Sequence, residues 1–448
     1  MGDTGSMSIL GAVPPAPPGV GAACRARLVE VDRLEWRVGD GGDPAALAAA
    51  FCASYRGAHT GAEGSVCGVA VLVSSAAGAV MVGGATGAPS PVPAVPDLAL
   101  VAFAHGPARE PAPPGAFAVG GWRASWTGAD HAKAVVAVQE AIGRGQVYVA
   151  NVVGHRSAAW SGDPAGIAAA VAGIPGAAWG GVLSGADWLV ASGSPEAFLT
   201  VGGARAATHP IKGTAPATAA GRADLLASVK ERAEHVMIVD LARNDLAQVA
   251  VPGTVAVERL FALAKWDRLW QAESTVVCEI GPGAGLADLL RALCPPGSVT
   301  GTPKLAMLDL VAGLEPAGRG PAMGAFGYLQ GDRVRLGVTI RTVALDRDRV
   351  HLWAGGGVTW RSDPDAEVAE AEAKARAVTA RLVLRPGTPS RSRSSAPWRA
   401  RGARRATRPG TGAAAASGSR ARRRTPAPWE GRGGAAGARP CRRSRRRR

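Results

Sequence analysis

The last 63 residues of the chain, from Pro386 to Arg448, contain no Ile, Leu, Val, Phe, Tyr or Met. A segment without these side chains cannot bury enough apolar surface to offset the conformational entropy that folding removes. The same segment carries 19 Arg and one acid, Glu430, which gives it a net charge of +18. The sequence therefore predicts a disordered, Arg-rich tail over residues 386–448, and a globular fold must be built from the 385 residues before it.

Those 385 residues contain 32 basic and 34 acidic side chains, so the +16 of the whole chain comes from the tail. A nucleic-acid-binding domain carries its positive charge on the folded surface that contacts phosphates. We therefore expect a near-neutral body, large enough for one or two cores, and no functional nucleic-acid binding by the tail. A GC-rich gene read in a noncoding frame yields the same composition, so a frameshift near Val383 is an alternative origin of the tail.

The beginning of the chain and its cysteines favour a cytoplasmic protein. Residues 1–26 are rich in Pro, Gly and Ala, which predicts a disordered lead, and they lack the basic and apolar segments of a secretory signal. The longest apolar stretch, 166–183, is interrupted by Pro175 and several Gly, which disfavours a membrane span. The six cysteines form no CxxC pair, so neither a zinc site nor a disulfide framework is predicted.

Hydrophobic patterns predict a mixture of strands and helices. Between residues 27 and 120, runs such as VCGVAVLVSS and AVMVGG alternate with Gly and Pro turns, which predicts a strand-rich N-terminal part of the fold. Further strands are expected at QVYVANVVGH, GAFGYLQ, VRLGVTIRTVAL and VHLWAGGGV. Helices are expected from Asp130 to Gly143, from about Arg222 to Gln248 with a further helical pattern to about Trp270, from Pro303 onward, and from about Ala366 to Leu382.

Two of these helices carry the same pair of carboxylates. Glu231 and Glu234, and likewise Glu367 and Glu370, are three residues apart, which places both members of a pair on one helix face. Such a pair is typical of a solvated helix face. Two pairs that meet would instead suit a hard cation such as Mg²⁺, which prefers oxygen ligands and keeps several waters. From the residues alone, both interpretations stay open.

Two lysines and one arginine lie in unusual contexts. Lys212 lies in THPIKGTAP, whose Pro and Gly residues predict a defined loop. Burial or nearby positive charge would lower the pKa of its amine and make it a nucleophile, whereas an exposed loop lysine is the alternative. Lys304 stands where the loop PGSVTGTP enters a helix, a place that can hold a carboxylate. Arg341 interrupts an apolar strand pattern and would need a carboxylate partner if it faced inward.

The joint order of these segments is more specific than any one of them. From about Asp130 to Val383, the blocks QVYVAN, SGSPEAFL, THPIKGTAP, ERAEHVMIVDLARNDL, PGSVTGTPK, GAFGYL, VTIRTV, GGGV and SDPDAEVAEAEAKARAV follow one another. This series resembles the chorismate-utilising enzymes and, among them, component I of aminodeoxychorismate synthase. The resemblance implies an α/β (α+β) fold in which two mainly antiparallel sheets pack together with helices outside, and a catalytic core over residues 121–385.

The resemblance also implies a reaction and its residues. Chorismate and ammonia would give 4-amino-4-deoxychorismate, for 4-aminobenzoate and folate or for secondary metabolism. Lys212 would be the covalent nucleophile and Glu196 the general acid and base. Mg²⁺ would be held by Glu231, Glu234, Glu367 and Glu370. Substrate contacts would come from Thr214, Thr300, Gly301, Lys304, Tyr328, Arg341, Gly355, Gly356, Gly357 and Lys374. The GGG run also fits a bulge or another close backbone approach. No Cys lies in a glutaminase setting, so ammonia would come from a separate glutamine amidotransferase subunit.

Three positions separate the related activities. Anthranilate synthase component I typically has Ala where this chain has Lys212. Isochorismate and salicylate synthases carry a water-activating Lys at the position of Val149. Gln271 stands where the family usually has His. The first two positions favour aminodeoxychorismate synthase, and the alternatives within the same class are anthranilate synthase component I and 2-amino-2-deoxyisochorismate synthase.

Overall fold

The computed structural model describes residues 28–57, 60–107, 113–266 and 269–383, so the predicted lead and tail lie outside the described residues. The helices are α1 (Pro44–Ser54), α2 (Ser75–Val82), α3 (Gly128–Gly143), α4 (Pro164–Ala172), α5 (Ala219–Ala227), α6 (Val229–Ala247), α7 (Leu286–Leu293), α8 (Lys304–Ala312) and α9 (Pro364–Thr379), together with the 3-10 helix η2 (Gly297–Val299). The strands are β1 (Leu28–Trp36), β2 (Val66–Val73), β3 (Leu98–His105), β4 (Phe117–Val119), β5 (Arg123–Ala124), β6 (Val149–Gly162), β7 (Gly181–Ser184), β8 (Leu189–Ser192), β9 (Ala197–Gly202), β10 (Arg205–Thr208), β11 (Ile211–Pro216), β12 (Ala256–Trp266), β13 (Leu269–Glu279), β14 (Gly301–Thr302), β15 (Ala325–Gln330), β16 (Arg333–Val338), β17 (Thr342–Leu345) and β18 (Arg349–Val358).

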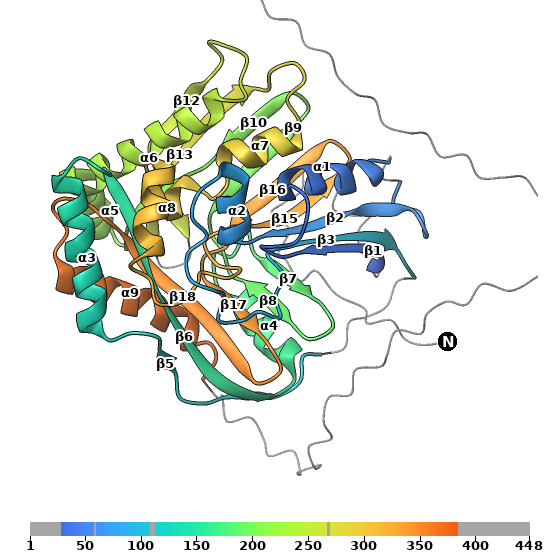
Figure 1. Cartoon of the computed structure of the whole chain (residues 1–448), viewed down its shortest axis with the longest axis horizontal. Coiled ribbons are helices and arrows are strands. Elements are labelled where there is room, and N and C mark those ends of the chain that lie inside the picture. Colours follow the sequence, from blue (N-terminus) through green and yellow to red (C-terminus); the bar gives the residue numbers. More distant parts are fainter. Residues whose placement is uncertain (1–27, 58–59, 108–112, 267–268, 384–448) are drawn as a thin grey trace, which may run out of the picture. The chain divides into compact units, whose positions relative to one another are not determined.

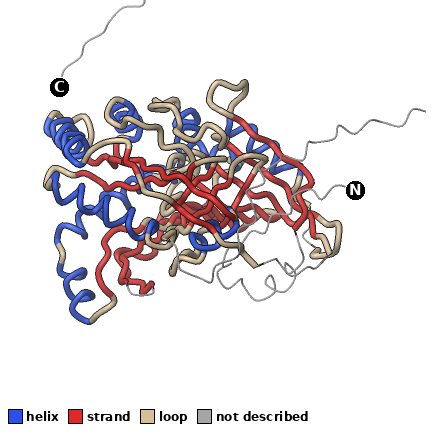
Figure 2. Tube along the Cα trace, turned by 90° about the horizontal axis from the view of Figure 1, so that it is seen from below, coloured by secondary structure: helices blue, strands red, loops and turns tan. Residues whose placement is uncertain are grey.

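In the described part of the chain, the strands form two sheets. The 10-stranded sheet has the order β1-β3-β2-β15-β16-β9-β10-β13-β11, with β12 on β13, and the 8-stranded sheet has the order β14-β6-β18-β17-β8-β7, with β4 and β5 on β6. The strand pairings are antiparallel. In Figure 2 the strands run through the middle and helices lie outside them. The predicted fold class is confirmed.

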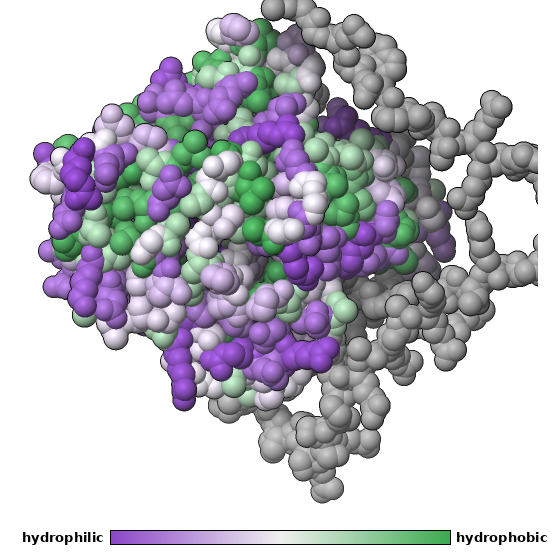
Figure 3. All heavy atoms as spheres, viewed as in Figure 1, coloured by the Kyte–Doolittle hydropathy of each residue, from purple (hydrophilic) through white to green (hydrophobic). Residues whose placement is uncertain are grey.

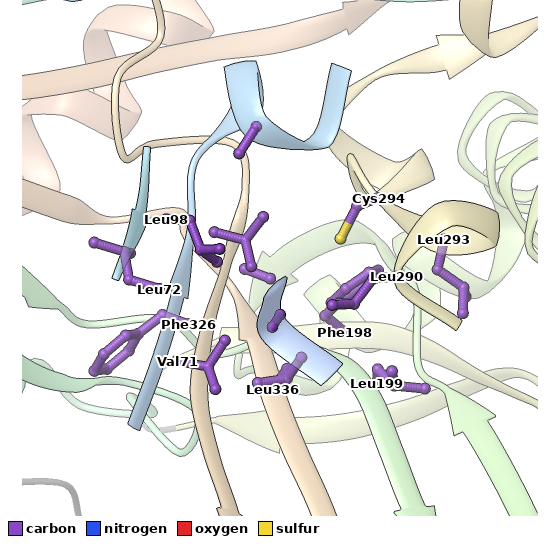
Figure 4. Packing of buried hydrophobic residues seen from close by; sticks show 14 of the residues in the cluster. Val71, Leu72, Leu98, Phe198, Leu199, Leu290, Leu293, Cys294, Phe326 and Leu336 are labelled. Atoms are coloured by element: carbon purple, nitrogen blue, oxygen red, sulfur yellow. The ribbon is translucent and has the colours of Figure 1, made fainter. Parts of the chain in front are cut away.

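The main core lies between the two sheets. Leu72, Leu199 and Leu336 of the larger sheet belong to the same buried cluster as Val153 and Leu183 of the smaller one, because facing sheets bury their inner side chains together. Figure 4 shows part of this cluster, where residues of β2, β9, β15 and β16 meet those of α7. Strand β3 is buried along its whole length, since α1 also packs against it.

Helices α6 and α9 each begin at a capped residue. The Ser228 hydroxyl accepts a hydrogen bond from the Glu231 N–H at the start of α6, and the Asp363 carboxylate accepts one from Ala366 N–H at the start of α9. Helix α9 lies along β18, and α3 packs against α9 and β6 (Figure 1). The caps thereby fix the first turns, which carry Glu231 and Glu367.

Two predicted elements have the wrong type. The run AVMVGG, expected as a strand, lies mainly in helix α2, because Ser74 caps the helix and Gly83, with a left-handed φ of 73°, ends it. The helical pattern expected up to Trp270 is instead strand β12 and the start of β13. The residues of β12 pair with β13 from Ala256 to Trp266, and this pairing outweighs their helix-permissive Leu and Ala content.

Two other predicted elements are divided. The helix expected over 222–248 breaks at Ser228, whose extended backbone ends α5 and begins α6. The strand expected at VRLGVTIRTVAL becomes β16 and β17, which belong to different sheets. Arg341, directly before β17, has a left-handed φ of 49°, so the chain turns there from one sheet to the other.

Figure 3 shows hydrophilic residues interspersed with hydrophobic ones over the face that it draws. Among the residues that the structure describes, none of the helices has both the length and the apolar character that crossing a membrane requires.

Candidate functional site

A bulge in strand β11 positions Lys212. Ile211 lies opposite Glu273 of β13 and Thr214 lies opposite Gln271, so Lys212 and Gly213 together face the single residue between them on β13. Gly213 has a left-handed φ of 88°, and a Cβ there would lie 2.9 Å from Leu225. Such bulges bend a strand and turn a side chain in a new direction. Here the bulge belongs to the segment that carries the predicted nucleophile.

The Lys212 amine lies among charged side chains of several elements. Among the described residues its Nζ makes no hydrogen bond or ion pair, and it lies 3.3 Å from where a Cβ on Gly357 would be. Loss of hydration lowers the pKa of Lys212, and the nearby Lys374 ammonium lowers it further, against the opposing effects of Glu196, Glu234 and Glu370. The amine is therefore deprotonated, and able to attack an electrophile, over a wider pH range than an exposed lysine.

Glu196 is a buried carboxyl group at the start of β9, 5% exposed. The Ser194 hydroxyl accepts a hydrogen bond from its N–H at 3.2 Å. Burial raises the pKa of Glu196 to about 7, although the Ser298 hydroxyl, the Lys212 charge and the Ile211 N–H stabilise the carboxylate. A carboxyl group with this pKa can both donate and accept a proton near neutral pH.

Arg341 faces inward, as the sequence allowed, and its carboxylate neighbour is Glu196. Burial lowers the pKa of Arg341 and the negative charge of Glu196 raises it. The Arg341 carbonyl accepts a hydrogen bond from Gly193 N–H at 3.0 Å, which ties the segment before Glu196 to the turn between β16 and β17. The guanidinium thus provides a positive charge beside the predicted acid.

The four predicted metal-binding glutamates come from α6 and α9. Glu231 Oε2 lies 3.3 Å from where a Cβ on Gly213 would be, and Glu367 Oε2 lies 2.8 Å from that position on Gly356. Glu367 Oε1 accepts a hydrogen bond from Ser362 Oγ at 2.8 Å, and Glu370 pairs with Lys374 at 2.7 Å. Within the described ranges no three His, Cys, Asp or Glu side chains are close enough to hold a metal ion. The donors suit Mg²⁺ chemically, because this ion binds through one or two carboxylates, several waters and an anionic substrate.

The three glycines of β18 serve different contacts. A Cβ on Gly355 would lie 1.9 Å from the Val152 carbonyl, so this glycine is needed for strand pairing. Gly356 and Gly357 instead leave space for Glu367 and for the Lys212 amine, respectively. Lys374 Nζ donates a hydrogen bond to the Gly355 carbonyl at 3.0 Å. The glycine run therefore brings helix α9 and strand β18 close to Lys212.

The loop residues Thr300 and Gly301 are placed by the fold itself. The Thr300 hydroxyl is fully buried and donates to the Pro296 carbonyl at 2.9 Å. A Cβ on Gly301 would lie 2.0 Å from the Val149 carbonyl of β6. Thr214 is exposed on β11. The substrate role predicted for these three residues stays a prediction.

Lys304 is held by groups of the protein itself, and its predicted substrate role stays a prediction. Its Nζ pairs with Asp245 Oδ2 at 3.0 Å and donates to the carbonyls of Ala292 at 3.1 Å and Leu293 at 3.0 Å. An ammonium group has three donors, so all three are used within the protein. The residue anchors the start of α8 to α6 and α7 and has no donor left for a ligand.

Tyr328 lies apart from Glu196 within the larger sheet. Tyr328 of β15 pairs with Arg335 of β16, which in turn pairs with Thr200 of β9. Tyr328 is therefore two strands away from β9, at the level of Thr200, which is four residues after Glu196. At ordinary sheet spacings this is roughly 10 Å across and 13 Å along the sheet. Its ring packs over Gly68 of β2. The strand pairings place Tyr328 away from Glu196, and its predicted substrate contact stays a prediction.

Several residues of the site were not singled out from the sequence. Ser298 lowers the pKa of the Glu196 carboxyl group, and Asn151 Nδ2 donates to the Ser298 and Thr300 carbonyls at 3.3 and 2.9 Å. His235, directly after Glu234, bonds to the backbone of Lys212. All three stand inside the motif blocks quoted above, which was the available signal.

Val149 and Gln271, two of the positions at which the resemblance predicts a different residue, are both buried. Val149 Cγ2 lies 3.8 Å from where a Cβ on Gly357 would be, so an apolar side chain borders the space near Lys212. Gln271, opposite Thr214 on β13, has a buried Oε1 without a hydrogen-bond partner among the described residues. No lysine at position 149 is available to activate a water molecule.

Comparisons with known proteins agree with this geometry. Residues 88–380 match the family model of chorismate binding enzymes, so the match begins before the first motif block. Component 1 of aminodeoxychorismate synthase from Salmonella typhimurium is 33% identical over 256 residues, which are 56% of each chain. Anthranilate synthase component 1 from Streptomyces coelicolor is 38% identical over 196 residues, 42% of this chain and 38% of the relative. The chain thus matches only about half or less of the length of these relatives.

A solved structure shows the same fold. Anthranilate synthase component I from Streptococcus pneumoniae superposes with a TM-score of 0.67 at 20% identity, covering 84% of this chain and 95% of that one. At this identity the likeness concerns the fold. The family match extends over most of the described residues and includes the smaller sheet, the larger sheet except β1 and β2, Lys212, Glu196 and the carboxylates of α6 and α9. The chain belongs to the family of chorismate binding enzymes.

Proposed function

We propose that the chain acts as component I of an aminodeoxychorismate synthase and converts chorismate and ammonia to 4-amino-4-deoxychorismate and water. The observation that carries the proposal is the placement of the Lys212 amine, with its lowered pKa, in the same cluster as Glu196, whose pKa is about 7. A nucleophile and a proton donor are the two groups that the covalent reaction needs.

The first half of the reaction forms a bond between the Lys212 nitrogen and chorismate C2. The ring double bonds shift, the C4–O bond breaks, and Glu196 protonates the departing hydroxyl group, which leaves as water. The attacking amine gives up its proton to the solvent. Arg341, whose charge lies beside Glu196, would then stabilise the carboxylate that Glu196 becomes.

The second half reverses the displacement with a different nucleophile. Ammonia adds at C4, the C2–N bond breaks, and Lys212 leaves as the amine after taking up a proton. The lowered pKa of Lys212 assists this step as well, because a less basic amine is a better leaving group. The covalent bond of Lys212 to C2 thus allows ammonia to replace the hydroxyl group at C4, and the lysine is regenerated.

We propose Mg²⁺ as the cofactor, held by Glu231, Glu234, Glu367 and Glu370 directly or through water. When bound, it would withdraw electron density through the substrate carboxylate and favour displacement. The Glu370–Lys374 pair, which is partly exposed on both sides, can open at little cost to let Glu370 bind the ion.

The proposed source of ammonia is a separate glutamine amidotransferase subunit. Two relatives are named as component 1 of their synthases, which supports a second component here. We also propose a cytoplasmic location, because the described cysteines, Cys52, Cys67, Cys278 and Cys294, remain thiols.

The product tests the proposal. Purified protein with chorismate, Mg²⁺ and ammonium should yield 4-amino-4-deoxychorismate, identified by liquid chromatography and mass spectrometry. Anthranilate or 2-amino-2-deoxyisochorismate would instead assign the chain to the alternatives, which the likeness to anthranilate synthase supports. A reaction without ammonium serves as the control for a water adduct.

A further inference from the structure

The bulge in β11 leaves the backbone of Lys212 outside the regular strand ladder. Regular pairing resumes at Ile211 on one side and Thr214 on the other. A carbonyl outside the ladder needs another hydrogen-bond donor if it is buried, because a buried polar group without one destabilises the fold. The fold supplies this donor from helix α6, at His235.

His235 is fully buried and hydrogen-bonded on both ring nitrogens. Its Nδ1 lies 3.2 Å from the Lys212 carbonyl oxygen, and its Nε2 lies 2.5 Å from Ser274 Oγ of β13. Phe261 of β12 packs edge-on against the imidazole, with ring centroids 5.1 Å apart, and the Arg232 guanidinium lies over the Phe261 ring. The imidazole therefore has one orientation, set by three strands and its own helix.

The direction of each hydrogen bond follows from the donors available. The Phe261 N–H donates to Ser274 Oγ at 2.9 Å. Ser274 has one hydroxyl proton, which it donates to His235 Nε2, since a carbonyl cannot donate and Nδ1 must do so. His235 Nδ1–H then donates to the Lys212 carbonyl.

We propose that His235 is a positioning residue for Lys212: the relay from Phe261 N–H through Ser274 and His235 to the Lys212 carbonyl holds the bulge that aims the amine at the substrate. This inference rests on the proposed role of Lys212. The carbonyl lies next to Gly213, whose left-handed backbone defines the bulge. Without the donor, the peptide between the two residues can rotate and the amine loses its direction.

Two substitutions separate positioning from packing. In His235→Asn, the side-chain N–H₂ stands two bonds from Cβ, as Nδ1 does, and can still donate to the Lys212 carbonyl. In His235→Gln, the amide reaches one bond farther, toward Ser274, and the contact with Lys212 is lost. We expect His235→Asn to keep kcat within about fivefold of the unchanged protein and His235→Gln to lose about a hundredfold, since misplacing a reacting group by about 1 Å costs that much. KM for chorismate should stay within about twofold in both.

The control compares the same replacement at a histidine that lies in another part of the fold. His105 of β3 is also buried, and we expect His105→Asn to leave kcat and KM unchanged. Thermal unfolding of each variant reports any loss of packing. Equal losses of kcat in folded His235→Asn and His235→Gln would overturn the proposal.

A second variant keeps the test decisive if His235→Gln does not fold. Ser274→Ala removes the hydroxyl that donates to His235 Nε2 and orients the imidazole but leaves His235 itself, and we expect kcat to fall about tenfold with KM unchanged. A folded Ser274→Ala protein with full kcat would contradict the relay.

A double substitution shows whether His235 acts through Lys212. In the Lys212→Ala background, the Asn and Gln replacements should give the same residual rate, because the group that they position is gone. If they still differ there, His235 acts by another route. Failure of the product assay refutes the proposed function, whereas the right product with no difference between Asn and Gln refutes only the positioning.

Discussion

Lys212 and Lys304 come from similar Gly- and Pro-rich motif blocks, but the fold uses them in opposite ways. Lys304 has three acceptors, the Asp245 carboxylate and two carbonyls. Among the described residues, the Lys212 Nζ has no hydrogen bond or ion pair, and Lys374 lies near enough to lower its pKa. One ammonium group is stabilised in place, and the other amine is kept available.

The difference shows that burial alone does not make a lysine reactive. Both side chains are removed from water, yet only at Lys304 does the protein replace the lost hydration with hydrogen bonds. At Lys212 the nearest groups act over distance, so the proton is held weakly. Substitutions at the two lysines should therefore affect different properties of the protein.

The largest effect is expected for Lys212→Ala. Loss of the nucleophile should reduce formation of 4-amino-4-deoxychorismate at least about a thousandfold, as with other covalent catalytic groups. The free energy of unfolding should change little or increase, because a dehydrated amine is removed. Chorismate turnover and urea unfolding are the two measurements. An undiminished rate would refute the covalent role.

Glu196→Gln should follow in size. Removing a general acid costs about 10²–10⁴-fold in kcat. In the unchanged protein, kcat should fall as the pH rises through about 7, since the protonated acid that assists departure of the hydroxyl is then lost. The Gln variant should lose this limb of the pH profile. Glu140→Gln on α3, an exposed glutamate, is the matched control and should keep it. If kcat of Glu196→Gln still fell as the pH rose through about 7, a group other than Glu196 would be responsible for that fall.

Lys304→Met should affect stability rather than chemistry. It leaves the buried Asp245 carboxylate without its partner, which costs about 3–5 kcal/mol in unfolding free energy. Burial already raises the pKa of Asp245. The loss of unfolding free energy in Lys304→Met should therefore be largest near pH 7. It should become smaller as the pH falls toward the ordinary pKa of an aspartate, because the Asp245 carboxyl then takes up a proton.

Urea unfolding at pH 7 and pH 5, relative to the unchanged protein, measures this difference. In Lys304→Met with Asp245→Leu, most of the loss should be recovered, because no unpaired charge remains. A specific rise in KM for chorismate in folded Lys304→Met would instead support the predicted substrate role of Lys304.

The sequence predicted the fold through the order of its blocks but not every element within it. Helix α9, which the Asp363 side chain caps, and helix α8, which follows Pro303, lie where expected, apart from the last residues of α9. Strand β12 was predicted as helix, because the run AVERLFALAKW fits both periods and only its pairing with β13 decides. Long-range pairing is not visible in a local pattern.

The same limit applies to the site. Lys212 and Glu196 were found because their blocks are distinctive, and the fold brings them together although β10 and β13 lie between β9 and β11 in the sheet. The partner of Lys304 could not be found, since Asp245 lies on a different helix far away in the sequence. The role of His235 depends on a bulge, which leaves no signature other than Gly213. A contact made by one carbonyl outside the strand ladder can be found only in the three-dimensional structure.

The smallest effect is expected for Tyr328→Phe, which tests the boundary of the site. The ring packs over Gly68, and its strand position is two strands from Glu196. Removing only the hydroxyl keeps this packing, so kcat and KM for chorismate should each stay within about twofold, in the range of substitutions away from a site. Arg341→Lys, beside Glu196, is the contrasting variant and should lower kcat/KM by more than tenfold, because a lysine cannot reproduce the planar guanidinium. If Tyr328→Phe raised KM more than Arg341→Lys did, the substrate would extend along β15, and the cluster around Lys212 would be only part of the binding site.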